Sequence, residues 1–383
     1  MMLVGDASAA YLGEIGSHLR MFGRAIEPIY RAVVARRNAA FDAGRNVHRV
    51  RGAAGTIPVI SIGNLSVGGT GKTPMVMHVL RLLLEHEQRP CVAMRGYSKS
   101  KDGAADETDA YRRAFPDVPI VAQPDRLAGL RALLDRVPPS AQPDCIVLDD
   151  GFQHRTIARE LDVALIDATP GRSVFEDRLL PAGWLREPVE SLGRAGAVVL
   201  THAELATGDT LEKLTQRVRE RTSRPIAVAR HVWTGFVRGV SKERPGSENR
   251  GTQEENGGIR EEMLPLDVLI GRRVVGCCAI GNPIAFTHPL ARTVDQEGRP
   301  DSGVLFRVLP DHDPFSRRTV AELCTLARNS NAEFIVVTDK DWSKLRHIPD
   351  STWPCPVLRP DLALVFDSGR EEFDRLVLGA RGT

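Results

Sequence analysis

The sequence predicts an α/β protein with a mostly parallel sheet that is covered by helices on both faces. Apolar runs of strand length alternate with helical stretches along most of the chain, and this alternation is typical of βαβ units. The composition is that of an ordinary globular protein, with 42% hydrophobic and 26% charged residues. With 383 residues, we expect one large or two medium domains.

Composition and charge argue against several classes of function. The chain has 51 Lys and Arg against 49 Asp and Glu, so a global basic footprint is missing and we expect no nucleic-acid partner. No apolar run is long enough for a spanning helix, and an acidic residue near the start argues against a signal peptide. The cysteines show no CxxC spacing, which favours reduced, buried thiols in a cytosolic protein. Those in apolar, strand-like stretches are Cys91, Cys145, Cys277 and Cys278.

The expected strands are short apolar runs bounded by turn signals. They lie at residues 57–62, 91–94, 120–122, 145–148, 163–166, 198–200, 274–279, 304–308, 334–338 and 362–366. Helices are expected at residues 73–87 and 125–136.

The N-terminal region is basic and amphipathic. Between residues 11 and 51 there are eight arginines but only three acidic residues. Apolar residues recur there at steps of three and four, which predicts one helical face, and Pro28 predicts two helices or one kinked helix. The face is formed by Leu12, Ile15, Leu19, Phe22, Ile26, Ile29 and Val33. Such a helix either packs on its own domain or lies in an anionic membrane surface.

The strongest chemical signal is a Gly-rich turn between an expected strand and an expected helix. Its residues are Ser66, Val67, Gly68, Gly69, Thr70, Gly71, Lys72 and Thr73. They nearly fit the Walker A pattern, with Ser66 where a glycine is usual. Backbone N–H groups of such a loop surround a phosphate at a helix N-terminus. We expect Lys72 to reach the β- and γ-phosphates and Thr73 to bind Mg²⁺.

A second apolar strand ends in two carboxylates, Asp149 and Asp150, which suits the acidic site that a phosphate loop needs for its metal. The sequence leaves open which of the two contacts the metal. Where a GTPase usually reads guanine, this chain has Thr201-His202-Ala203-Glu204, without the expected Lys and Asp. ATP is therefore favoured as the nucleotide. The phosphate loop alone is compatible with motors, switches and small-molecule kinases.

The further motifs resemble those of the tetraacyldisaccharide 4′-kinase (lipid A 4′-kinase) family, in the family's order. They are SIGNLSVGGTGKTP (61–74), RGY (95–97), LDDGFQHR (148–155), LPAGWLREP (180–188), AIGNP (279–283), LPDHDPF (309–315) and TDKD (338–341). The resemblance implies transfer of the ATP γ-phosphoryl group, with Mg²⁺, to the 4′-hydroxyl of a tetraacylated glucosamine disaccharide 1-phosphate. It also implies a peripheral enzyme at the cytoplasmic face of the bacterial inner membrane, and it favours the membrane interpretation of the N-terminal helix.

The resemblance assigns roles to matching positions. It places Arg186 near the transferred phosphate and Glu187 among the carboxylates around the metal. Asp106 falls at an acid implicated in acceptor activation, with Asp109 as the alternative, and His312 falls at its histidine partner. The residue after His312 is an aspartate where the family usually has a second histidine. A carboxylate, or an Asp–His pair, can accept the proton of a sugar hydroxyl.

Four segments follow from these features. Residues 1–50 form the N-terminal amphipathic membrane-associating segment, residues 51–238 the P-loop kinase core, residues 239–265 a flexible insertion or linker, and residues 266–383 a smaller C-terminal α/β lobe. Gln153 and His154 belong to a family motif but receive no role of their own. The expected partners are the lipid substrate and the membrane surface, with no obligate protein partner. The alternatives are a P-loop ATPase or GTPase switch acting through a protein partner, and a non-catalytic membrane adaptor.

Overall fold

The computed structural model describes residues 16–96, 105–241, 259–295 and 303–380. The chain divides into two compact units. The first, here called the P-loop unit, contains the described residues up to Val232 together with those from Leu364 onward. The second unit is Trp233–Ala363. The last part of the chain, from Leu364 onward, thus belongs to the P-loop unit again.

The P-loop unit is built on parallel strands, in the order β5-β4-β6-β3-β7-β8-β9. Their bounds are β3 Val59–Asn64, β4 Pro90–Met94, β5 Ile120–Ala122, β6 Cys145–Asp149, β7 Leu161–Asp167, β8 Ala197–Thr201 and β9 Ile226–Ser241. Every residue of β3, β4, β6, β7 and β8 is buried, as expected of a sheet covered on both faces. A small hairpin of β1 (Arg51–Gly52) and β2 (Gly55–Thr56) precedes them.

Helices cover both faces of this sheet, because successive strand residues point to opposite sides. On one side Ile60 and Ile62 pack in one core with residues of α3, α4 and α10, and on the other Val59 packs with residues of α5. The helices are α2 Gly16–Asp42, α3 Lys72–Glu85, α4 Ala105–Ala114, α5 Arg126–Arg136, α6 Gly208–Arg219 and α10 Arg370–Gly379. Short 3₁₀ turns are η1 Pro139–Ala141, η2 Val189–Arg194 and η3 Ala203–Leu205. The predicted α/β class is confirmed.

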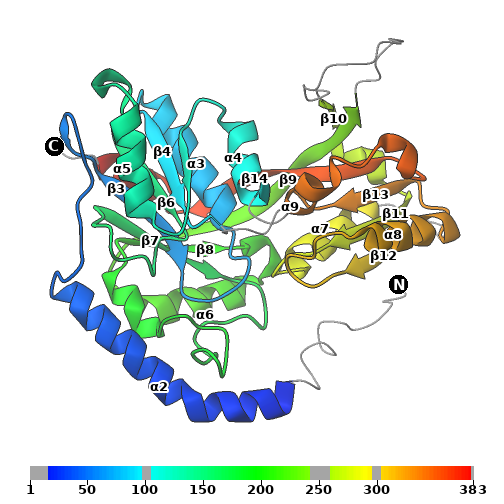
Figure 1. Cartoon of the computed structure of the whole chain (residues 1–383). Coiled ribbons are helices and arrows are strands. Elements are labelled where there is room, and N and C mark those ends of the chain that lie inside the picture. The colour runs from blue at the N-terminus through cyan, green and yellow to red at the C-terminus, as the bar shows by residue number, and fades with distance from the viewer. Residues whose placement is uncertain (1–15, 97–104, 242–258, 296–302, 381–383) are drawn as a thin grey trace. The chain divides into compact units, whose positions relative to one another are not determined.

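Helix α2 is continuous through Pro28, and Figure 1 shows that it changes direction along its length. The kinked-helix alternative is therefore correct, as an internal proline removes one backbone hydrogen bond without always ending a helix. Among the described residues, no helix combines the length and apolar character that crossing a membrane requires.

The second unit repeats the strand–helix alternation. Its parallel strands follow the order β12-β11-β13-β14. Residues of α8 pack in one hydrophobic core with Val275 and Cys277 of β11, and residues of α7 pack in another with Val274 and Cys278. The bounds are β10 Ile259–Leu264, β11 Arg273–Cys278, β12 Gly303–Val308, β13 Phe334–Val337 and β14 Val357–Ser368, with α7 Ile284–Val294, α8 Arg317–Asn329, α9 Asp339–Leu345, η4 Leu266–Leu269 and η5 Asp350–Thr352.

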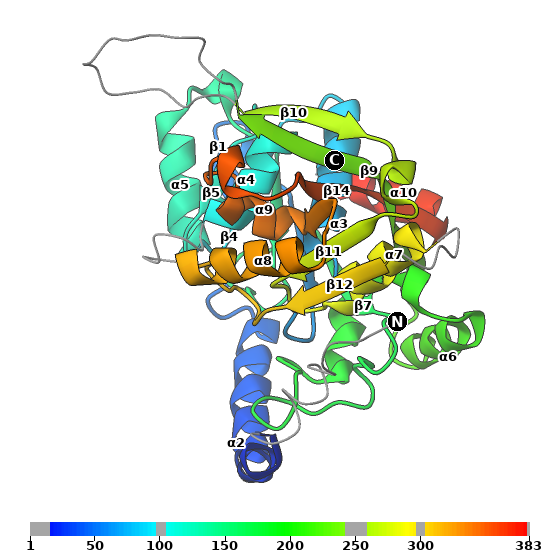
Figure 2. The same cartoon turned by 90° about the vertical axis from the view of Figure 1, so that its right-hand side faces the viewer.

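The segment expected to be a flexible linker begins and ends in regular structure. Strand β9 continues to Ser241 and pairs antiparallel with β10, so that Ile259 faces Ser241 (Figure 2). Residues 242–258 lie outside the described part of the chain. The four cysteines predicted to be buried thiols are free and buried, and all four lie within strands: Cys91 in β4, Cys145 in β6, and Cys277 and Cys278 in β11.

Candidate active site

The Gly-rich turn joins β3 to α3, as the motif predicts. Gly71 has a φ of 76° in the left-handed region, and a Cβ there would lie 2.7 Å from Cε1 of His231, so the position requires glycine. No side chain caps the first turn of α3. The backbone N–H groups at this helix N-terminus are therefore oriented to receive an anion.

Two neighbouring segments hold the turn in place. The Thr201 hydroxyl, at the end of β8, donates to the carbonyl of buried Thr70 at 2.9 Å. The backbone N–H of Val67 donates to the Trp184 carbonyl at 2.8 Å. The guanidinium of Arg186 donates to the Ser66 carbonyl at 3.1 Å. The LREP motif thus contacts the phosphate loop directly.

A charged centre lies beside the start of α3. Arg186 forms a two-bond ion pair with Asp150, at 2.8 and 2.9 Å, and Lys72 Nζ lies 3.5 Å from the same carboxylate. Asn64 accepts hydrogen bonds from both cations, Lys72 at 3.3 Å and Arg186. The sequence motifs that carry Lys72, Asp150 and Arg186 therefore meet at one point.

Asp150 is ionised at neutral pH. Burial raises the pKa of its carboxyl group, but the charges of Lys72 and Arg186 and the Arg186 hydrogen bond outweigh burial and leave the pKa well below its ordinary value. The backbone of Asp150 has a φ of 51°, which is uncommon for any residue other than glycine. This backbone conformation turns Asp150 out of the strand direction that Asp149 still follows.

Asp149 has different surroundings. It is the buried last residue of β6 and accepts a hydrogen bond from the Tyr111 hydroxyl at 2.9 Å. The guanidinium of buried Arg126 donates to the Asp149 carbonyl at 3.1 Å. The Asp149 carboxylate thus bonds Tyr111, while the Asp150 carboxylate joins the cluster with Lys72.

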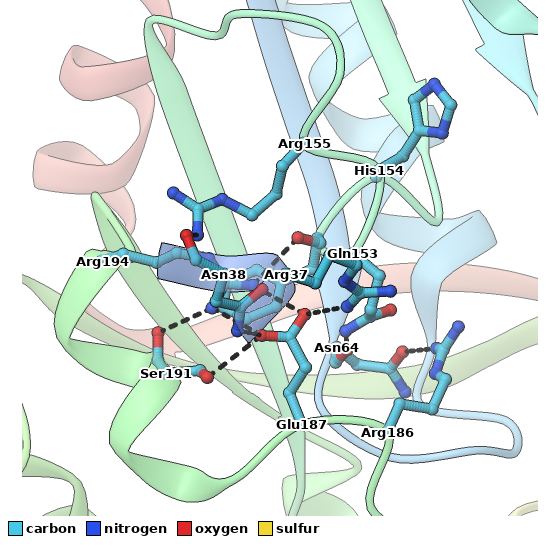
Figure 3. Close-up of polar contacts among 12 residues, drawn as sticks. Arg37, Asn38, Asn64, Gln153, His154, Arg155, Arg186, Glu187, Ser191 and Arg194 are labelled. Atoms are coloured by element: carbon cyan, nitrogen blue, oxygen red, sulfur yellow. Dashed lines mark hydrogen bonds and ion pairs between the residues drawn. The ribbon is translucent and has the colours of Figure 1, made fainter. Parts of the chain in front are cut away.

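Glu187 does not join this charged centre. Its fully buried carboxylate accepts two hydrogen bonds from Arg194, at 2.8 and 3.1 Å, and one each from Asn38 at 2.8 Å and Ser191 at 3.1 Å (Figure 3). Arg37 lies 3.6 Å away. Both oxygens accept hydrogen bonds from protein donors in this structure, and the assignment of Glu187 as a metal ligand stays a prediction. Among the described residues, no group of three or more His, Cys, Asp and Glu could hold a metal ion.

Gln153 and His154 acquire positions that the sequence did not suggest. Gln153 donates to the backbone carbonyl of Asn64 at 2.8 Å, which fixes the segment that leads into the phosphate loop. His154 contacts the Thr156 hydroxyl at 3.0 Å, and burial lowers the pKa of His154 to about 4. Asn64 was missed as well, although a polar residue at a buried strand end just before the loop was a usable signal.

The proposed acid–base residues lie in different units. Asp106 is the second residue of α4, and the alternative Asp109 lies one turn later, 3.8 Å from Arg112. His312 follows β12 with a φ of 64°, and its Nε2 lies 3.4 Å from Lys340 Nζ. The structure does not decide between Asp106 and Asp109, so both assignments and that of His312 stay predictions.

Three family-like motifs of the second unit converge on one another. The buried Asp341 carboxylate accepts hydrogen bonds from the Ala279 N–H at 2.9 Å and from the Thr338 hydroxyl at 2.6 Å. The His312 N–H donates to the Ala279 carbonyl at 3.3 Å. The AIGNP, DHD and TDKD sequences are therefore parts of one loop cluster at the ends of β11 and β13.

The family model described as tetraacyldisaccharide-1-P 4′-kinase matches residues 19–378. A tetraacyldisaccharide 4′-kinase of Anaeromyxobacter dehalogenans (strain 2CP-C) is 33% identical over 335 residues, covering 83% of this chain and 79% of the relative. One of Parabacteroides distasonis is 30% identical over 307 residues, 76% of each chain. A crystal structure of LpxK from Aquifex aeolicus in complex with ATP is similar with a TM-score of 0.65 and 27% identity, covering 95% of this chain and 100% of that one. The chain belongs to the tetraacyldisaccharide-1-P 4′-kinase family.

Proposed function

We propose that this protein transfers the γ-phosphoryl group of ATP to the 4′-hydroxyl of a tetraacyldisaccharide 1-phosphate, a step of lipid A biosynthesis. Family membership and the activity named for the relatives support this proposal. The single observation of the structure that carries it is the cluster of Lys72, Asp150 and Arg186 at the uncapped N-terminus of α3. A switch acting through a protein partner is not favoured, since nothing in the family comparison points to one.

The phosphate loop is the proposed ATP site. Backbone N–H groups of residues 68–73 and the partial positive charge of α3 bind the β- and γ-phosphates. Lys72 and Arg186 stabilise the charge that develops on the phosphoryl oxygens during transfer. In the structure both cations neutralise Asp150, so the triphosphate takes over part of an existing ion-pair network. The similar LpxK structure with ATP supports this choice of nucleotide.

The residues proposed to hold Mg²⁺ are Thr73, Asp149 and Asp150. Their oxygens are the hard ligands that Mg²⁺ prefers, and Asp150 is ionised because its pKa is lowered. Bound Mg²⁺ supplies charge neutralisation to the β- and γ-phosphates. The family resemblance adds Glu187 to this set, and in the structure its oxygens accept from Arg194, Asn38 and Ser191.

Acceptor activation is proposed to use Asp106, with His312 in support. A sugar hydroxyl becomes a competent nucleophile when a positioned carboxylate can take its proton. The family resemblance supports these two residues, and Asp109 remains the alternative to Asp106. Their contribution is separate from phosphate binding, because neither belongs to the Gly-rich turn.

The proposed location is the cytoplasmic face of the bacterial inner membrane, through α2. Ile29 and Val33, one turn apart, are 65% and 60% exposed on this helix. Exposed arginines, among them Arg24 and Arg36, accompany them. Apolar residues next to basic ones suit an anionic lipid surface, where the lipid substrate also resides.

The experiment that tests this function is a product analysis. Purified protein, the tetraacyldisaccharide 1-phosphate and Mg²⁺ are incubated with ATP or with GTP, and the lipid is examined by mass spectrometry and NMR. We expect one added phosphoryl group, on the 4′-oxygen, with ATP as the better donor and no transfer in excess EDTA. Phosphorylation at another hydroxyl would contradict the proposed acceptor, and an unmodified lipid would contradict the kinase assignment.

A further inference from the structure

Helix α2 is packed on the P-loop unit through a face that differs from its apolar stripe. The inward positions Gly23, Glu27, Tyr30, Val34 and Asn38 recur at steps of three and four. Glu27 and Val34 are buried, and a Cβ on Gly23 would lie 2.7 Å from the Pro181 carbonyl. The helix therefore rests closely against the LPAGW segment and is an integral part of this unit.

Three contacts join α2 to Arg186 and Glu187. The Tyr30 hydroxyl donates to the backbone carbonyl of Arg186 at 3.0 Å. The Asn38 amide donates to the Glu187 carboxylate at 2.8 Å, and Arg37 lies 3.6 Å from it (Figure 3). All of these residues belong to the P-loop unit.

The backbone of Arg186 is consequently held from two sides. Its N–H donates to the Leu65 carbonyl at 2.7 Å, at the beginning of the phosphate loop, while its own carbonyl accepts from Tyr30 of α2. Its side chain reaches Asp150 and Asn64. The position of the guanidinium thus depends on a peptide group that is fixed between the phosphate loop and α2.

Glu187 adds a second constraint one residue later. A buried carboxylate is stable only when charged or polar donors surround it. Two of its donors, Ser191 and Arg194, belong to η2, and Arg194 also donates to the Phe152 carbonyl at 2.9 Å and lies 3.8 Å from the Phe152 ring centre. The remaining hydrogen bond comes from Asn38 of α2, so the carboxylate connects α2, η2 and the motif that contains Asp150.

We propose that Tyr30 and Asn38 are positioning residues for Arg186, so that the helix expected to lie on the membrane also sets the geometry of phosphoryl transfer. Tyr30 acts on the Arg186 peptide, and Asn38 acts through Glu187. This inference rests on the proposed function. It makes α2 part of the catalytic apparatus as well as a membrane attachment.

The test uses the full-length protein in three variants. Tyr30→Phe removes only the hydroxyl that binds Arg186, and we expect kcat to fall by about 5-fold or more, the scale of one lost hydrogen bond or a slight misplacement. Asn38→Asp places a second carboxylate against Glu187, and we expect kcat to fall by about 100-fold. In both variants the KM for ATP should stay within about 3-fold of its original value, since the phosphate loop keeps its own donors.

The double variant Asn38→Asp/Glu187→Gln separates positioning from a direct role of Glu187. It exchanges donor and acceptor between positions 38 and 187 and removes the extra carboxylate that Asn38→Asp alone introduces. We expect it to recover part of the kcat that Asn38→Asp loses, because the hydrogen bond between positions 38 and 187 returns with donor and acceptor exchanged, although Arg194 loses one of its two acceptors. A metal ligand at position 187 could not be replaced in this way.

The control is a substitution of the same kind outside the site. Asn329→Asp, the same substitution at an exposed helical position, should leave kcat unchanged, and vesicle binding and thermal unfolding are measured for every variant. Wild-type activity in Tyr30→Phe and Asn38→Asp would overturn the proposal, and so would a folded double variant that fails to recover. If Asn38→Asp does not fold, Tyr30→Phe decides. An inactive wild type would instead contradict the proposed function.

Discussion

The left-handed backbone of Asp150 shows how a single residue shapes the charged centre. A φ of 51° costs free energy for a residue with a Cβ, on the order of 1 kcal/mol, and persists only where surrounding contacts demand it. Here the demand comes from Arg186 and Lys72, which hold the carboxylate in place. Asp149, which keeps the strand conformation, points instead to Tyr111. One backbone dihedral thus gives two adjacent aspartates different surroundings.

Replacing Lys72 by alanine is expected to lower kcat by about 10²–10³ while leaving the fold intact. The loss is the usual scale for removing one preorganised group that stabilises transition-state charge. Stability should change little, because Asp150 keeps its two-bond ion pair with Arg186. Steady-state kinetics and thermal unfolding check both parts. Lys213→Ala, at an exposed position of α6, is the matched control. Near wild-type turnover of Lys72→Ala at saturating ATP would contradict the assignment of the phosphate loop.

Alanine at Asp106 or at His312 is expected to lower kcat by about 10²–10⁴, the scale of general acid–base catalysis. The affinity for ATP should change little, and activity should fall at low pH as the base becomes protonated. Kinetics of each single variant and of the double variant give the measurement, and a double variant scarcely worse than the worse single one indicates residues acting in one step. Asp109→Ala is the control. A crippled Asp109→Ala beside an active Asp106→Ala would show that Asp109 is the base.

His154 is expected to make stability depend on pH. Burial lowers its pKa from 6.5 to about 4, and Arg126 and Arg159 act in the same direction. Between these two values the unfolded chain binds more protons than the folded one, so the free energy of unfolding falls as pH decreases through this window. Urea unfolding at about pH 7 and about pH 5 should show a smaller difference for His154→Gln than for the wild type. The exposed His288→Gln is the control, and an unchanged difference in His154→Gln would refute the prediction.

At the residue scale the sequence predicted the groups of the charged centre but not their arrangement. Lys72, Asp150 and Arg186 stand in motifs whose chemistry is readable from residue type and spacing. The carboxylate of Glu187 lies against Arg194, Asn38 and Ser191, and no local pattern in the sequence indicates these partners. Asn38 and Tyr30 carry no motif signal, since their partners are about 150 positions away in the chain, at separations of 149 and 156.

Helix α2 is the element whose two faces have different tasks. Its inward face holds Tyr30 and Asn38, and its outward face exposes Ile29 and Val33. The packed face and the exposed apolar residues proposed to contact the membrane therefore lie on separate sides of the helix. Deletion of residues 1–40 would disturb both at once, since Glu187 would lose Arg37 and Asn38. A change confined to the outward face tests membrane contact alone.

The double variant Ile29→Ser/Val33→Ser is expected to weaken binding to anionic vesicles by about 10-fold or more. Each buried apolar side chain contributes on the order of 1.5 kcal/mol to membrane contact, and serine removes most of it. Binding of the wild type should also weaken with salt, because surface charge is screened. Cosedimentation with vesicles is the measurement, and Ile284→Ser on α7, 43% exposed, is the matched control. Unchanged binding by the double variant would place the membrane contact elsewhere.

Most strands could be predicted to within about two residues, because parallel strands buried on both faces are continuous apolar runs. The hairpin of β9 and β10 could not. Its second strand contains Arg260, Glu261 and Glu262, whose composition is typical of a loop, and its pairing depends on cross-strand contacts rather than on local propensity. Pro28 illustrates the same limit for helices, since tertiary packing of Tyr30 and Asn38 keeps α2 continuous beyond it.

At the scale of the whole molecule, the sequence did not reveal that the chain returns to the P-loop unit from Leu364 onward, after the second unit. Helix α10 packs against α3, where Phe373 and Val377 join the core of Val76 and Leu80. Asp374 of α10 pairs with His78 of α3 at 2.9 Å. His78 and Asp374 are 296 positions apart in the chain, and no local sequence pattern predicts a contact at such a separation. The strand–helix alternation nevertheless predicted both α/β units.

The proposed activity of the charged centre is phosphoryl transfer from ATP to a lipid. The most direct measurement follows the label of [γ-³²P]ATP into the tetraacyldisaccharide 1-phosphate in mixed micelles, with wild-type protein, with Lys72→Ala, and with an acceptor whose 4′-position is already phosphorylated. Labelled lipid is expected only from wild-type protein with the free 4′-hydroxyl. Release of labelled inorganic phosphate without labelled lipid, or equal labelling of the blocked acceptor, would contradict it.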